Sequence, residues 1–241
     1  MKELLKRSQF CVGLVMACRK LRRDWVTWRG YRARGRVIAA YLAGTTERKL
    51  QIGCGRNLLP GWLNADLIPA VPEAIYLNAT TRFPLPDASF DCIFSEHMIE
   101  HIPFAAGQKM LRECHRILKP GGKIRISTPN LRNIASLMHE PATPTKQDYV
   151  RAASDKYIPE NTRRLPGFVV NNFYWDFGHH FVYDPDTLAF ALESAGFAQI
   201  EPVVTGQSAT PALRGLERHD QIVGRNLDDF ETMIFEATKP A

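Results

Sequence analysis

The stretch KLQIGCGRNLLPGWLNADL (49–67) holds the residue types that bind a nucleoside. A short apolar run enters the GCG turn at 53–55, and a second apolar run ends at Asp66. Glycines allow a tight turn and close backbone approach to a ligand, and an acid at a strand end suits ribose hydroxyls. Because Leu58 stands where a dinucleotide fingerprint needs a third glycine, the pattern favours a nucleoside without a pyrophosphate.

Histidines gather in three further stretches that could carry acid–base or metal chemistry. HMIEH (97–101) has the spacing of a zinc motif in which two His bind the metal and Glu activates water. NFYWDFGHHFVYDPD (172–186) is the densest aromatic and imidazole cluster, and GLERHD (215–220) adds another Glu and His. For each histidine taken singly, a structural role is the stronger interpretation.

Alternating strand and helix patterns surround these stretches. Five strands are predicted by apolar runs at 49–55, 62–67, 74–80, 90–97 and 123–130. Helical spacing is evident at 105–118, before a KPGG stop, and at 184–197, while 199–204 and 232–240 predict two terminal strands that pair antiparallel. Strands separated by helices or short connections predict a mainly parallel sheet covered on both faces.

Residues 131–183 interrupt this alternation. They are rich in Pro, Arg, Asn and aromatic residues, which predicts an inserted loop or small helical lid. The chain of 241 residues fits one domain with a sizeable core. We therefore expect a single domain over 47–241 that includes this lid and acceptor region.

Positive charge is concentrated at the N-terminal end. Residues 1–36 hold eleven Lys or Arg and two acidic residues, a net charge of +9, while the whole chain carries +6. An anionic partner and a solvated basic helix explain this equally well. FCVGLVMAC (10–18) resembles part of a secretory signal, but RKLRR follows it and opposes translocation. We predict a basic, amphipathic helical extension over 1–46 that lies on the domain or on an anionic membrane surface.

Composition excludes several classes of protein. Hydrophobic residues make up 45% and charged residues 23%, which is typical of a soluble globular protein and not of a disordered or fibrous one. The five cysteines form no CxxC pair and indicate reduced thiols. We expect a cytoplasmic protein that contacts the inner face of the membrane through its basic N-terminus.

Five segments follow one another between residues 50 and 197: LQIGCG, GWLNADL, FPLPDASFDCIFSEHMIEHI, MLRECHRILKPGGKIRISTPNL and LAFALESAGF. In this order they resemble the class I S-adenosylmethionine-dependent methyltransferases, most closely the bacterial methyltransferase type 11 group. The resemblance implies a Rossmann-like, doubly wound α/β fold with a seven-stranded sheet whose last strand is antiparallel. It also implies S-adenosylmethionine as the cofactor, over the carboxyl ends of strands one to four.

Carried over position by position, the resemblance implies ten cofactor-binding residues. They are Gly53, Cys54, Gly55, Asp66, Leu67, Asn78, Ala79, Ser95, Glu96 and His97. Asp66 would bind the ribose hydroxyls, and Leu67 and Asn78 would lie near the adenine. Two positions depart from the family: Gln51 replaces the acid two positions before the first glycine, and Asn78 replaces a common Asp.

Methyl transfer from a sulfonium needs aligned reactants and exclusion of water, and a hydroxyl acceptor also needs a base. The loops at 172–183 and 215–220 carry many acid–base side chains, which favours oxygen as the acceptor atom. The catalytic candidates are Asp176, His179, His180, Glu217 and His219, with His97 as the replacement. Aromatic side chains suit a sugar ring, and the resemblance extends to relatives in cell-surface polysaccharide synthesis. We therefore expect a sugar or lipid-linked glycan hydroxyl as the acceptor.

Three alternatives stay open. A nucleic-acid or small-molecule N-methyltransferase fits the basic N-terminus, but no NPPY-type motif occurs, so a nucleic-acid acceptor is not expected. A non-catalytic S-adenosylmethionine-binding module is suggested by Gln51. A zinc hydrolase built on HMIEH lacks an evident downstream glutamate helix, so we assign the motif to the loop after strand four and expect no metal. The sequence leaves the oligomeric state open.

Overall fold

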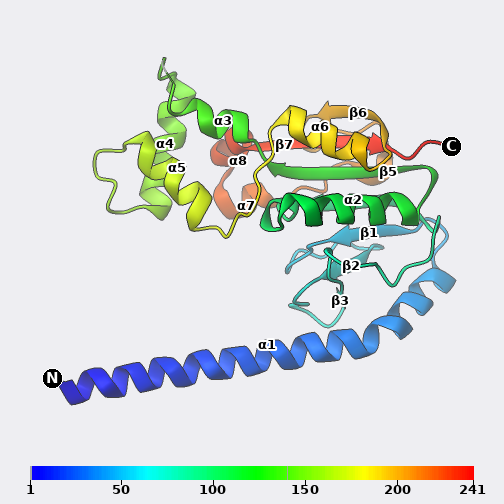
Figure 1. The fold of residues 1–241 in the computed structure, drawn as a ribbon, viewed down its shortest axis with the longest axis horizontal. Coiled ribbons are helices and arrows are strands. Elements are labelled where there is room, and N and C mark those ends of the chain that lie inside the picture. The colour runs from blue at the N-terminus through cyan, green and yellow to red at the C-terminus, as the bar shows by residue number, and fades with distance from the viewer. Residues whose placement is uncertain (1, 140) are drawn as a thin grey trace.

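The computed structural model describes residues 2–139 and 141–241, with side chains from residue 12 onward. Its centre is one seven-stranded sheet in the order β3-β2-β1-β4-β5-β7-β6 (Figure 1). The strands are β1 (Lys49–Ile52), β2 (Leu63–Asp66), β3 (Ile75–Tyr76), β4 (Phe90–Glu96), β5 (Leu118–Pro129), β6 (Ala198–Val203) and β7 (Thr232–Thr238). The first five are parallel, and β7 runs antiparallel to both β5 and β6. The predicted seven-stranded α/β sheet with an antiparallel last strand is confirmed.

The order of the strands reverses between β1 and β4. Connections leave β1 towards β2 on one side and β4 towards β5 on the other, so a crevice opens beyond their carboxyl ends. Residues 53–57, which follow β1, and Glu96, at the end of β4, lie at this edge. Open α/β sheets bind their ligands at such a point.

The main core lies between the sheet and two helices, α2 (Phe104–Ile117) and α6 (Pro185–Ser194). Ile93 and Ile124 of the sheet are fully buried there against Met110 of α2 and Leu188 of α6. On the opposite face, Phe94 belongs to a second cluster together with loop residues including Trp62, Leu213 and Leu216. Alternate strand residues thus face two apolar layers, as expected for a sheet covered on both sides.

The expected lid region is helical. It contains α3 (Leu131–Ser136), α4 (Pro144–Tyr157) and α5 (Pro166–Trp175). They share a core cluster that contains Ile134, Tyr149 and Phe173, and this cluster also takes in Leu227 from α8 (Arg225–Glu231). The short helices α7 (His219–Val223) and α8 were not predicted from the sequence, because each is polar and under two full turns of apolar pattern.

The N-terminal helix α1 (Lys2–Gly44) is one continuous element. Its last turns pack onto the domain: Ile38 joins the main core, and Tyr41 stacks on Phe90 and donates a hydrogen bond to the Lys49 carbonyl. The division between extension and domain therefore falls inside α1 and not at residue 46. The first half of α1 extends away from the sheet (Figure 1). Within the described residues, no helix is long and apolar enough to cross a membrane.

Candidate functional site

A cavity of about 630 Å³ opens at the carboxyl edge of the sheet. Its floor is formed by residues 53–57 after β1, by Glu96 and His97 at the end of β4, and by Pro129 at the end of β5. Its walls come from α4, α5, α7 and α8, with Tyr149, Tyr157, Phe173, Phe177, His179 and His219 among the lining side chains. A volume of this size holds a small organic ligand.

The two glycines of the turn have different surroundings: Gly53 packs against another part of the protein, and Gly55 faces open space. Gly53 has φ +75°, and a Cβ there would lie 2.5 Å from Cγ of Met98. The chain's own packing therefore requires glycine at this position, in addition to the close cofactor approach that the sequence suggests. A Cβ on Gly55 (φ +53°) would instead meet open space. Burial and the charge of Asp66 raise the pKa of the Cys54 thiol to about 12, so this side chain stays neutral.

Asp66 lies at the end of β2, next to the glycine turn. Its Oδ2 accepts a hydrogen bond from the Gly55 amide and its Oδ1 accepts one from the Ile68 amide, both at 2.8 Å. Each carboxylate oxygen keeps a second lone pair, which a ribose hydroxyl can use. The neighbouring side chains of Leu67 and Ile68 are 51% and 39% exposed, so an apolar surface is available beside the carboxylate. These residues fit the nucleoside of S-adenosylmethionine.

Three other predicted cofactor residues point elsewhere. Asn78 Oδ1 accepts hydrogen bonds from the backbone amide and the hydroxyl of Thr80, which closes a local turn. The Ala79 side chain belongs to the main core, and Ser95 is 1% exposed inside β4. These three residues do not line the cavity, and Asp66 and Leu67 adjoin it through the glycine turn without lining it themselves.

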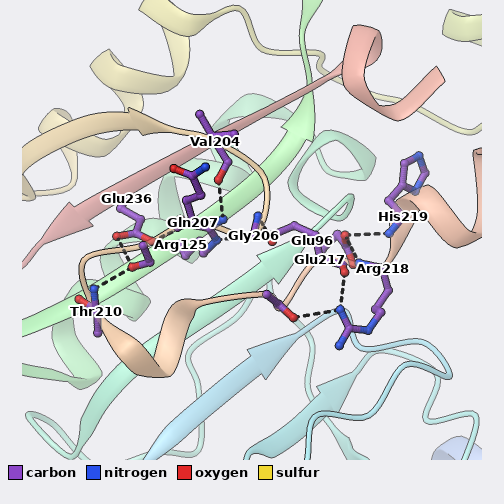
Figure 2. Close-up of polar contacts among 12 residues, drawn as sticks. Glu96, Arg125, Val204, Gly206, Gln207, Thr210, Glu217, Arg218, His219 and Glu236 are labelled. Atoms are coloured by element: carbon purple, nitrogen blue, oxygen red, sulfur yellow. Dashed lines mark hydrogen bonds and ion pairs between the residues drawn. The ribbon is translucent and has the colours of Figure 1, made fainter. Parts of the chain in front are cut away.

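Glu96 ties the end of β4 to the loop before β7. Its Oε1 accepts hydrogen bonds from the backbone amides of Arg218 and His219, at 2.8 and 3.0 Å (Figure 2). Burial raises the pKa of the Glu96 carboxyl, while these two hydrogen bonds and the nearby histidines oppose the rise. Its carboxylate therefore holds the start of α7 in place at the cavity wall.

A buried ion-pair network holds Glu217, the residue directly before Arg218. Arg125 of β5 is fully buried, and its guanidinium contacts Glu217 at 2.5 Å and Glu236 at 2.6 Å (Figure 2). The second oxygen of Glu217 accepts a hydrogen bond from the Gly206 amide. Glu217 therefore neutralises a buried arginine and lies outside the cavity, so its predicted role as a base is wrong for this geometry.

His97 is held by contacts on both ring nitrogens. Nε2 lies 3.0 Å from the Thr232 hydroxyl, and Nδ1 lies 3.4 Å from Glu100 Oε1. Burial alone would lower the pKa of His97, but the nearby Glu100 carboxylate, with the charges of Glu231 and Glu96, outweighs it and raises the pKa. The residue also has φ +44°, an uncommon backbone conformation that a non-glycine residue adopts only where its surroundings enforce it. His97 is a fixed part of the floor with no free nitrogen for a substrate.

His219 has the arrangement of a general base. Its ring stacks on His97 with centroids 3.5 Å apart, and its Nε2 lies 3.1 Å from Glu231 Oε1. The other Glu231 oxygen accepts a hydrogen bond from the Tyr149 hydroxyl. When Nε2–H donates to a carboxylate, Nδ1 keeps the lone pair that can accept a proton. His219 lines the cavity, as do Glu231 and Tyr149.

The GHH segment is divided by the structure. His179 lines the cavity, and burial lowers its pKa, so the neutral ring is favoured. His180 is exposed and lies outside the cavity, where its backbone amide donates to the Glu100 carbonyl. Asp176 is exposed, accepts a hydrogen bond from Asn172 and lines a separate hollow on the outer side of α5. Of the predicted catalytic residues, the structure brings together His97, His179 and His219.

Several residues of the site were missed from the sequence. Glu231, Tyr149 and Glu100 reach the cavity from α8, α4 and the 3-10 turn η1 (Ile99–His101). Glu100 was visible only as part of HMIEH, and the turn it occupies is not the α-helix that a zinc protease motif requires. Glu231 and Tyr149 stand in no motif, and only the three-dimensional pairing with His219 marks them.

Comparison with known proteins gives a consistent picture. A family model described as "Methyltransferase domain" matches residues 50–126. The chain is 37% identical over 103 residues to a "Probable S-adenosylmethionine-dependent methyltransferase" of Mycolicibacterium smegmatis, a match that covers 34% of this chain and 37% of that protein. It is 30% identical over 115 residues to a ubiquinone biosynthesis O-methyltransferase of Xanthomonas oryzae pv. oryzae, covering 39% of this chain and 47% of that protein.

The chain thus matches less than half the length of these curated relatives. Among solved structures, a SAM-dependent methyltransferase from Archaeoglobus fulgidus is 20% identical and superposes with a TM-score of 0.48, covering 90% of this chain and 94% of that chain. The fold assignment itself follows from the strand order and directions described above.

The Arg125 network generates a stability prediction. Replacing Arg125 with Met leaves two buried carboxylates without their cation, so we expect a loss of about 3–5 kcal/mol in the free energy of unfolding. Arg132→Met is the matched control, because Arg132 pairs with Asp186 at the surface, where both side chains are more than half exposed; a change of at most ~1 kcal/mol is expected. Urea titration of both variants measures the difference, and equal losses would contradict the assigned role of Arg125.

Proposed function

Because this chain belongs to the class I S-adenosylmethionine-dependent methyltransferases, we propose that it methylates a hydroxyl group of a sugar or lipid-linked glycan. The observation that carries the choice of oxygen is the His219–Glu231 pair at the cavity wall. A hydroxyl must lose its proton during methyl transfer, and a histidine oriented by a carboxylate is suited to accept it.

The cofactor end of the site is formed by the glycine turn and Asp66. Bound there, S-adenosylmethionine supplies an electrophilic methyl group on its sulfonium. Asp66 orients the ribose through two hydroxyls, and the open face of Gly55 allows the nucleoside to approach the backbone. Glu96 keeps the start of α7 close to this end of the cavity by binding two backbone amides.

The acceptor end of the site is formed by the helices of the lid. Tyr149, Tyr157, Phe173 and Phe177 give it aromatic surface, and Asn172 and Gln221 add hydrogen-bonding groups. Sugar rings present apolar faces and polar edges, which this combination can stack against and hydrogen-bond. His219 would take the hydroxyl proton as the oxygen bonds to the methyl group and the methyl–sulfur bond breaks, leaving a neutral thioether product. The same walls keep water from the reacting atoms.

The small-molecule N-methyltransferase is the second candidate. It is supported by the same fold, but an amine acceptor depends less than a hydroxyl on the oriented His219–Glu231 pair, because a neutral amine attacks without losing a proton first. A product assay with glycans, phenols and amines separates the two, since each transfer yields the same thioether with a differently methylated acceptor.

The nucleoside end is tested by Asp66→Ala. Loss of two hydrogen bonds to the ribose should weaken S-adenosylmethionine binding by roughly 5- to 150-fold, corresponding to about 1–3 kcal/mol. Isothermal titration calorimetry measures this, with Asp87→Ala as the control because Asp87 lies at the surface in a contact with Arg116. Unchanged affinity in a folded Asp66→Ala protein would place the ribose elsewhere.

The acceptor end is tested by His219→Ala. Removing a general base should lower turnover by ~10²–10⁴-fold and leave cofactor affinity almost unchanged. His139→Ala serves as the control, since His139 is exposed and lies outside the cavity. If the His219→Ala variant methylates the acceptor substrate at the wild-type rate, another group takes the proton.

A further inference from the structure

Three ligand-type side chains meet in the cavity wall, next to the stacked rings of His97 and His219. One nitrogen of His101, one of His179 and one oxygen of Glu100 all lie within 4.8 Å of one another. Glu100 and His101 come from the turn after β4, and His179 comes from the loop after α5. None of the three is assigned a chemical role in methyl transfer as derived above.

Glu100 has an unused oxygen in a fully buried position. Its residue is 0% exposed, and its Oε2 accepts a hydrogen bond from the Thr128 hydroxyl. Among the described residues, Oε1 has no hydrogen-bond partner; His97 Nδ1 lies 3.4 Å away and His101 Nε2 4.0 Å away. A buried carboxylate oxygen is costly to leave in this state unless a cation or donor reaches it.

Each of the two imidazoles has a ring nitrogen within 4.8 Å of a Glu100 oxygen. His101 Nδ1 lies 3.2 Å from the Gly178 carbonyl, which fixes the proton on Nδ1 and leaves Nε2 as an acceptor facing Glu100. A second ring nitrogen bonded to a backbone carbonyl is the arrangement usual for metal-binding histidines. His179 Nδ1 is buried and, in the part of the chain that the structure describes, has no hydrogen-bond partner.

Backbone hydrogen bonds connect the turn that carries Glu100 and His101 to the loop that carries His179. The amides of His180 and Phe181 both donate to the Glu100 carbonyl, at 2.8 and 3.1 Å. Gly178 has φ +72°, a conformation that lets the loop turn its carbonyl towards His101. The backbone therefore positions His179 beside Glu100 without help from a ligand.

We propose that Glu100, His101 and His179 form a site for one divalent transition-metal ion, with zinc as the preferred occupant. Two imidazoles and one carboxylate with open positions are a recurrent donor set for such ions. Ligand atoms around one zinc lie ~3.3 Å apart, so the three side chains, whose ligand atoms lie within 4.8 Å of one another, would draw closer when an ion binds. The HMIEH spacing suggested zinc bound by His97 and His101, and we expected no metal there; the cluster proposed here instead joins Glu100 and His101 to His179, which lies far from HMIEH in the chain.

A role for this metal ion in catalysis rests on the proposed methyl transfer, whereas the binding of the ion does not. A cation at the cavity wall would hold the acceptor hydroxyl and ease the loss of its proton to His219. The test is calorimetric titration of the chelator-treated, dialysed protein with zinc chloride alone, together with elemental analysis of the complex.

We expect one zinc per chain, and more than about 100-fold weaker binding in His101→Ala and in His179→Ala, beyond the loss seen for outer partners of metal ligands. His180→Ala is the matched control, since His180 is the adjacent exposed imidazole, and it should bind zinc as the wild type does. Glu100 is left intact because it also binds Thr128.

Absence of stoichiometric binding, or equal weakening in His180→Ala, overturns the proposal. So does retention of zinc by His179→Ala with loss in His219→Ala, which would place the ion at the neighbouring group of His97, His219 and Asp228. S-adenosylmethionine binding is measured in the same samples. A protein that binds the cofactor and no zinc keeps the methyltransferase proposal, and one that binds zinc and no cofactor loses it.

A second inference comes from the free half of α1. From Val12 to Trp25 the described side chains are exposed, including Leu14, Leu21 and Trp25, and Trp28 is 57% exposed. Leu14, Cys18, Leu21, Trp25 and Trp28 are spaced four and three residues apart, so they form one stripe along the helix. An apolar stripe of this length on a protruding helix marks an interaction surface.

Charge distinguishes between the partners that could cover this stripe. Residues 1–36 carry a net charge of +9, so two copies of α1 side by side would repel each other. Arg29 stacks over Trp25 and Arg32 over Trp28, with centroid distances of 4.9 and 5.8 Å. Tryptophan beside arginine is suited to the boundary between lipid headgroups and acyl chains.

We infer that residues 12–32 of α1 lie on an anionic membrane surface. The last turns of α1 are fixed to the core by Ile38 and Tyr41, so the domain would be held at that surface by this helix. The free half of α1 extends to the same side of the molecule as the lid helices α4 and α5 (Figure 1), where the acceptor end of the cavity lies.

Vesicle sedimentation tests this inference. The protein should sediment with vesicles of phosphatidylcholine and phosphatidylglycerol, less so at high salt, and hardly at all with phosphatidylcholine alone. The double variant Trp25→Ala/Trp28→Ala should bind at least ~10-fold more weakly. Trp175→Ala, which removes an 80% exposed tryptophan of α5, is the control and should bind like the wild type. Equal binding by the double variant overturns the inference, as does a stable dimer in solution that the double variant abolishes.

Discussion

The buried guanidinium of Arg125 is the interaction on which the geometry of the site depends. It lies inside β5 with no exposed surface and is paired with both Glu217 and Glu236. A buried charged group that loses its partner is far more costly than a paired one, so the contact with Arg125 holds the Glu217 carboxylate against the sheet. The loop that contains Glu217 cannot leave the sheet without breaking this buried ion pair.

The ion pair at Glu217 also restrains His219, which follows two positions later and lines the cavity. His219 follows Glu217 closely in the chain, and Glu96 binds the two intervening amides of Arg218 and His219. β4 and β5 are neighbours in the sheet, so Arg125 of β5 and Glu96 of β4 hold three consecutive residues of this loop, 217–219 (Figure 2). The imidazole then meets Glu231 and the ring of His97, which are themselves fixed by α8 and by the turn after β4. A base held in this way needs little reorganisation when the acceptor arrives.

The strands and the proposed nucleoside end of the site could be predicted from the sequence because their signals are local. Apolar runs in β1, β4 and β5 give their positions, and the glycine turn followed by Asp66 is the stretch on which the proposed cofactor end depends. The pairing of His219 with Glu231 could not be predicted, since Glu231 lies in a short polar helix without a motif. In the sequence, Arg125 looks like an ordinary polar residue of an alternating strand, and Glu217 looks like a free acid. Only their contact in the structure, across ninety-two positions, shows that they form a buried ion pair. Gly53 was singled out from the sequence as a cofactor residue, and the structure shows that its contact with Met98 also requires glycine there.

The most direct measurement of this account is a crystal structure of the protein with S-adenosylhomocysteine. The account predicts the ribose hydroxyls on the Asp66 carboxylate and the thioether sulfur facing the space between Glu96 and His219. It also predicts that Glu96 still accepts both loop amides and that Arg125 still binds Glu217. A nucleoside bound away from Asp66, or a His219 ring turned away from the space in front of the sulfur by more than a water-bridged hydrogen bond, would contradict it.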